Sequence, residues 1–132
     1  MLRYAIAYVV MLALFPLLDA LWIGFAARGV YQGEIGALLL PKPNVAAAAA
    51  FYAIYAAGVL VFAVAPGLGG DWRRALGLAA LLGLMAYATY DLTNLATLRG
   101  FTLKLSLIDM AWGAAMTTAV AAVAGLVARR LG

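Results

Sequence analysis

Three aspartates lie inside long apolar segments of this chain, where a carboxylate is costly to bury. They are Asp19, Asp91 and Asp109. An Asp near the centre of a membrane-spanning helix costs about 2.5 to 3.5 kcal/mol on insertion scales, and such residues often belong to functional sites. In apolar surroundings a carboxylate can accept hydrogen bonds, pair with a cation or take up a proton. The sequence therefore allows hydrogen bonding, ion pairing or proton uptake at these three aspartates.

Polar and aromatic residues occur three or four positions from each aspartate, which places them on the same face of a helix. They could donate hydrogen bonds to the carboxylates or form the walls of a pocket. We predict a ligand-binding site made by Asp19, Trp22, Tyr87, Tyr90, Asp91, Asn94, Asp109 and Trp112. The spacing D-x-x-W occurs at residues 19–22 and again at 109–112. Chance or inverted internal symmetry would both account for this repeat.

Basic residues near the expected outer ends of the helices suggest a purely structural alternative. Arg28, Arg99 and Lys104 could form ion pairs with the aspartates and so lock the four helices together. In the other reading, the aspartates line a water-accessible pocket that opens to the outer face. Ionisable residues within membrane spans favour this functional reading.

The composition requires lipid as the solvent for much of the surface. Of 132 residues, 68% are hydrophobic and only 11% are charged, which is too apolar for a water-soluble domain. The net charge is +4, but no basic run exceeds two residues, so we expect no nucleic-acid partner. The chain contains neither Cys nor His, which removes disulfides, thiolate chemistry, histidine-ligated haem and ordinary zinc sites. We therefore expect no cofactor and no metal.

Four apolar segments are each long enough to cross a bilayer, which needs roughly 20 helical residues per crossing. We predict an all-α, integral membrane four-helix bundle with one domain over residues 1–132. The spans are expected near residues 4–26, 45–65, 75–96 and 105–128, with Asn44 as an N-cap. The first segment is too long for a signal peptide, and Asp19 and Trp22 occupy the place of a cleavage site, so we expect it to remain.

Orientation follows from the basic residues on the two sides of the membrane. Five would lie on the side of both termini and four on the other, which favours cytoplasmic termini. At 1.5 Å per residue, Asp19 and Asp91 lie about 23 Å from the cytoplasmic starts of their helices, and Asp109 about 6 Å from the opposite surface. All three aspartates are thus expected in the outer half of the membrane.

Small residues recur along two of the segments. A stripe on the last span, made of Gly113, Thr117, Ala121 and Gly125, and the alanines at 46–50 predict close helix packing, within one chain or between chains. Because a four-helix chain is too small to enclose a sizeable cavity, we predict a homo-oligomer. The connection over residues 27–44 is expected to lie along the membrane surface as an amphipathic segment.

Several motifs together resemble those of one bacterial family. They are LLDALWIG at 17–24, YQGEIG at 31–36, YDLTNLATL at 90–98 and DMAWG at 109–113. With these motifs the chain resembles domain-of-unknown-function family 2177, four-span membrane proteins, over nearly its whole length. The resemblance implies a fold and a location in the bacterial inner membrane; it brings no reaction, cofactor or catalytic residue.

Three functions remain open on this sequence. We favour binding or carriage of a small molecule or lipid in the Asp-lined pocket, with or without proton coupling. A lipid-modifying enzyme with two carboxylates as acid and base is less favoured, because no His, Cys or G-x-S-x-G nucleophile motif supports it. The third is an accessory subunit of a larger membrane complex. Membrane lipids are expected partners in every case.

Overall fold

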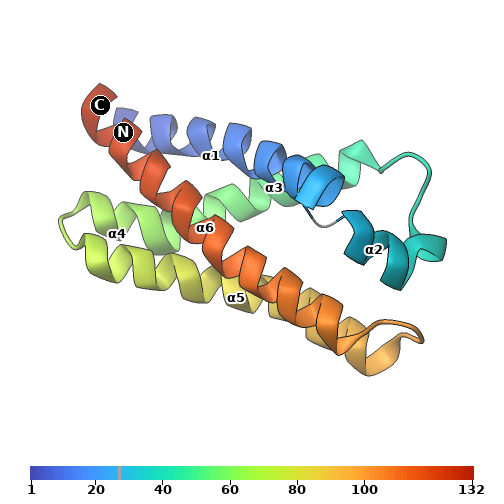
Figure 1. Cartoon of the computed structure of the whole chain (residues 1–132). Helices are drawn as coiled ribbons and strands as arrows, with labels where there is room; N and C mark the ends of the chain where they lie inside the picture. Colours follow the sequence, from blue (N-terminus) through green and yellow to red (C-terminus); the bar gives the residue numbers. More distant parts are fainter. Residues whose placement is uncertain (27) are drawn as a thin grey trace.

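The computed structural model describes residues 1–26 and 28–132, and helices make up most of that part of the chain (Figure 1). Four helical segments are long and apolar enough to cross a membrane, which confirms the all-α membrane bundle. Their ends differ from the predicted spans by at most three residues. The four segments are Leu2–Gly24, Val45–Leu68, Trp72–Thr97 and Leu103–Leu131.

Two of the four spans contain a wider, π-helical turn. The first span is α1 (Leu2–Leu21) followed by the π turn η1 (Trp22–Ala26). The second is α3 (Val45–Val59), the π turn η3 (Leu60–Val64) and α4 (Ala65–Leu68). The other two are single helices, α5 (Trp72–Thr97) and α6 (Leu103–Leu131), and a short helix α2 (Arg28–Ile35) and a 3-10 turn η2 (Gly36–Leu38) follow the first span. Single π turns are often found at functional sites, and η1 begins three residues after Asp19.

Side chains cap the starts of three spans. The Asn44 side chain accepts a hydrogen bond from the Ala47 amide at 3.0 Å, so the predicted cap is confirmed. Asp71 caps α5 and Thr102 caps α6 in the same way. Each cap satisfies an amide that would otherwise lack a partner at the helix end.

Helices α5 and α6 approach each other closely because glycines face each other along the contact. A Cβ atom on Gly83 would collide with the backbone oxygen of Gly113 and with the Thr117 side chain. A Cβ on Gly113 would collide with the Tyr87 ring. The stripe from Gly113 to Gly125 therefore packs inside the chain, where Thr117 and Ala121 are buried. It does not support the predicted homo-oligomer, which stays a prediction.

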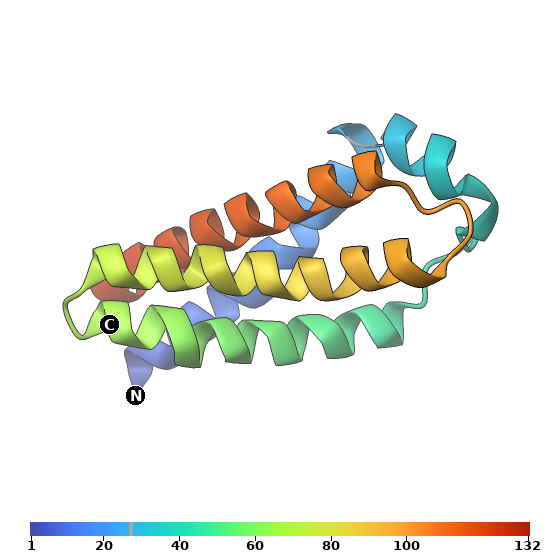
Figure 2. The ribbon, with the colours of Figure 1, turned by 90° about the horizontal axis from the view of Figure 1, so that it is seen from below.

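The two ends of the bundle differ in what covers them. Both termini lie at one end, and α2 and the loop between α5 and α6 lie at the other (Figures 1 and 2). At that second end Ile35 of α2 is buried against Phe101 and Leu105, so α2 folds back onto the bundle. Residues 39–44, which follow, are exposed. Ala27, where the amphipathic connection was expected to begin, lies outside the described residues.

Candidate functional site

Asp19 of α1 is buried and accepts hydrogen bonds from three other helices. The Tyr52 hydroxyl of α3 donates to it at 2.6 Å, and the Trp112 indole of α6 at 2.9 Å. The Tyr87 hydroxyl of α5 lies 3.4 Å from each carboxylate oxygen. All of these donors are neutral. One carboxylate thus connects all four spans without a cation.

The carboxylate of Asp109 in α6 has its hydrogen-bond partner in α2, which is not one of the four spans. Asp109 is 6% exposed, and its Oδ1 accepts a hydrogen bond from the Tyr31 hydroxyl of α2. Burial, together with the hydrogen bond to Asp109 and the negative charge there, raises the pKa of Tyr31 above its usual value. The Tyr31 hydroxyl therefore remains protonated at neutral pH and keeps its role as a donor. This bond holds α2 over the end of the bundle.

The two D-x-x-W motifs meet through their tryptophans. Trp22 and Trp112 stack with ring centroids 4.4 Å apart and an interplanar angle of 4°. Trp112 donates to Asp19, whereas the Trp22 indole nitrogen is buried and has no hydrogen-bond partner among the described residues. The hydrogen bonds of the two motifs are therefore not symmetric, although the rings are paired.

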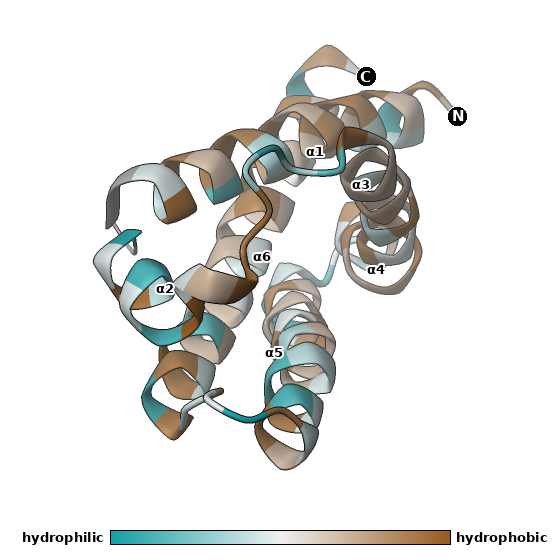
Figure 3. Ribbon diagram, turned by 90° about the vertical axis from the view of Figure 1, so that its right-hand side faces the viewer, coloured by the Kyte–Doolittle hydropathy of each residue, from teal (hydrophilic) through white to brown (hydrophobic). Residues whose placement is uncertain are grey.

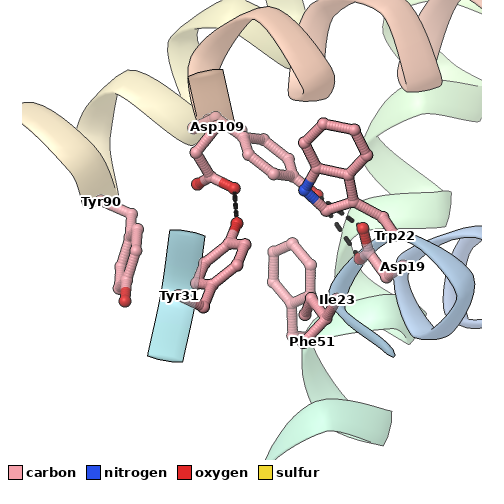
Figure 4. Close-up of a pocket in the computed structure, with 9 residues that line it drawn as sticks. Asp19, Trp22, Ile23, Tyr31, Phe51, Tyr90 and Asp109 are labelled. Atoms are coloured by element: carbon pink, nitrogen blue, oxygen red, sulfur yellow. Dashed lines mark hydrogen bonds between the residues drawn. The ribbon is translucent and has the colours of Figure 1, made fainter. Parts of the chain in front are cut away.

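A pocket of about 420 Å³ lies between the two aspartates Asp19 and Asp109 and the aromatic residues around them (Figure 4). Its volume falls within the range of small-molecule sites, roughly 300 to 1,000 Å³. Five of the eight residues predicted for a binding site line it, from α1, η1, α5 and α6. The complete lining is Asp19, Trp22, Ile23, Tyr31, Phe51, Ala86, Tyr87, Tyr90 and Asp109.

The other three predicted residues lie off the pocket wall. Trp112 stacks on Trp22, which does line the pocket. Asp91 is 1% exposed, and neither of its carboxylate oxygens has a hydrogen-bond partner among the described residues. Its carboxyl lies close enough to that of Asp109 for the two to interact electrostatically. Asn94, one turn further along α5, is half-buried and is not among the lining residues.

The basic residues proposed as ion-pair partners form no ion pair with the buried carboxylates in the part of the chain that the structure describes. Arg28, Arg99 and Lys104 are all exposed. The donors found on Asp19 and Asp109 are tyrosine hydroxyls and an indole. Within the described residues, no group of three or more His, Cys, Asp or Glu side chains could hold a metal ion.

Sequence reasoning missed the residues that α2 and α3 bring to the site. The sequence places Tyr31 in the connection expected along the membrane surface, and it predicts for the second span only an N-cap and close packing through its alanines. Two signals were present: the adjacent aromatics Phe51 and Tyr52 in an alanine-rich segment, and a lone tyrosine between two apolar spans. Helical spacing around an aspartate cannot find such residues, since it relates positions only within one helix.

Comparison with known proteins gives a family and no function. The sequence matches the family described as "Predicted membrane protein (DUF2177)" over residues 4–127. No curated protein and no solved structure matches the chain.

Proposed function

This chain belongs to the DUF2177 family of predicted membrane proteins, and we propose that it binds or carries a small molecule or lipid in the pocket between Asp19 and Asp109. One observation carries the proposal. The pocket lies among the membrane spans, its wall contains two carboxylates that are more than nine-tenths buried, and no lining residue is basic.

A bundle shaped by stability alone would not be expected to keep this arrangement. Buried carboxyl groups cost free energy compared with apolar side chains of similar volume, and an unfilled cavity costs more. Both costs occur together at this pocket, because buried carboxyl groups of the first and fourth spans line the cavity. A ligand that fills the cavity and interacts with the carboxylates would offset them.

The accessory-subunit alternative loses one of its supports. It depended on small-residue faces that remain free to pack against a partner. The α6 stripe is used inside the chain, where Gly83 and Tyr87 of α5 fit against it. No observation in the pocket favours an enzyme over a binding protein.

The proposal is tested by asking what stays bound during purification in a mild detergent. We expect mass spectrometry of the purified protein to find a bound small molecule or lipid in near-stoichiometric amount. The Ala86→Trp and Ile23→Trp variants should lose it, because both place a large ring in the pocket. Ile23 is 49% exposed, so a larger side chain there should not disturb folding.

Ala96→Trp is the matched control, since Ala96 is exposed on the same helix and does not line the pocket. It should retain the bound molecule at the wild-type level. Equal amounts in wild type and in both pocket-filling variants would contradict the proposal.

Cytoplasmic termini in a bacterial inner membrane are part of the same proposal. The weak excess of basic residues on that side supports it. Reporter fusions after Gly70 and after Gly132 should both report the cytoplasm, because those positions follow an even number of spans. An external signal from either fusion would reverse the orientation and place the pocket near the inner surface.

A further inference from the structure

The pocket wall carries carboxyl groups and no basic residue. Asp19 and Asp109 line it, and the Asp91 carboxyl lies close enough to that of Asp109 for the two to interact electrostatically. The hydrogen bond found on Asp109 uses Oδ1 only, so Oδ2 has no donor among the described residues. Opposite charges attract strongly where water is excluded. The electrostatics of this wall therefore favour a cation and disfavour an anion.

Aromatic rings form most of the remaining wall. The five rings come from four elements: one each from η1, α2 and α3, and two from α5. The face of an aromatic ring attracts cations, and several rings around one space are the usual way to hold a substituted ammonium group. The rings are those of Trp22, Tyr31, Phe51, Tyr87 and Tyr90.

The rim of the pocket faces the bilayer and is apolar or aromatic. Ile23 is 49%, Phe51 44% and Tyr90 50% exposed, and all three lie within membrane spans. Phe51 and Tyr90 lie about 10 Å from the outer ends of their helices at 1.5 Å per residue. Toward that end α3 and α5 diverge, and the view from the end shows them apart (Figures 1 and 3). An apolar chain attached to a bound head group could leave the pocket here without crossing water.

We propose, on the basis of the binding function above, that the ligand is an amphiphile with a cationic amine head group. The ammonium group lies between Asp19 and Asp109 among the aromatic rings. The hydrocarbon tail passes between α3 and α5 into the surrounding lipid.

Three small probes test the class of head group by isothermal titration calorimetry on the full chain in dodecyl maltoside. This detergent is a neutral amphiphile, so binding measured against it reports the head group. We expect decyltrimethylammonium to bind saturably with one molecule per chain. Decyl sulfate, with the same tail and the opposite charge, should bind at least about tenfold more weakly. Tetramethylammonium, which lacks the tail, should also bind more weakly.

Variants separate the charge of the site from its shape. Asp109→Asn should weaken decyltrimethylammonium binding about tenfold or more, because it removes a carboxylate from the wall. Asp71→Asn is the matched control: it makes the same change at an exposed N-cap on α5, where Asn caps equally well. Its affinity should equal that of wild type.

Each outcome bears on a different claim. If decyl sulfate binds as well as the cation and Ile23→Trp abolishes both, the pocket binds amphiphiles but the cationic class is wrong. If the cation binds equally to wild type, Asp109→Asn and Ile23→Trp, it binds outside the pocket and the cationic class is wrong, whereas the binding function fails only if the pocket-filling variants also keep the co-purified molecule. Absence of saturable binding by all three probes would also overturn the cationic class, and the co-purification test would then decide the binding function alone.

Discussion

Replacing Gly83 by alanine is expected to lower the free energy of unfolding by about 3 kcal/mol, the upper part of the range for overpacked cores. The new Cβ would overlap the backbone oxygen of Gly113, which α6 cannot move without shifting along its length. It would also meet the Thr117 side chain, which is held by a 2.7 Å hydrogen bond with Tyr55. Neither the Gly113 oxygen nor the Thr117 side chain can move at a small cost in free energy. Helices α5 and α6 must therefore separate.

Gly77→Ala is the control for this variant, because Gly77 lies on the same helix and a Cβ there meets nothing within 4 Å. Alanine is a better helix former than glycine by about 1 kcal/mol, so Gly77→Ala should be neutral or slightly stabilising. Unfolding in mixed micelles of dodecyl maltoside and sodium dodecyl sulfate, followed by circular dichroism, measures both variants. Equal stabilities would mean that the two helices do not approach as closely as described.

Asp19→Leu is the second substitution with a large expected effect on stability. It removes the acceptor of Tyr52 and Trp112 and the nearest acceptor of Tyr87. A buried donor left without a partner costs about 1 to 3 kcal/mol, so the total loss should reach about 3 kcal/mol or more. The comparison variant is Asp91→Leu, which removes a buried carboxyl whose oxygens have no hydrogen-bond partner among the described residues.

Asp91→Leu should leave stability unchanged or increase it, because an apolar side chain of similar volume avoids the desolvation of a carboxyl group. Thermal unfolding of both variants in the same detergent gives the contrast directly. Similar destabilisation by both would show that Asp91 has partners as important as those of Asp19. A stable Asp91→Leu protein with altered ligand binding would assign Asp91 to the function instead of to the fold.

Much of the site could be predicted because it depends on order within single helices. Asp19 with Trp22, and Tyr87 with Tyr90, share faces by the helical repeat, and all four line the pocket. Asp91 follows Tyr90 by one position, which turns it about 100° away around the helix axis. Asp91 consequently lies behind the pocket wall. Grouping polar residues by a spacing of three or four positions does not separate Asp91 from the residues that line the pocket.

The sequence alone determined the number of spans and the position of the three aspartates within them, because apolar segments of 20 or more residues have only one low-energy environment. Only the tertiary structure decided which side chains meet Asp19 and Asp109. Their donors Trp112 and Tyr31 are 93 and 78 residues away along the chain. Such pairs depend on how each helix is rotated about its axis and how closely it approaches its neighbours. The contact of Gly83 with Gly113, and the folding of α2 back onto Phe101 and Leu105, set those distances, and no periodicity within one segment encodes them.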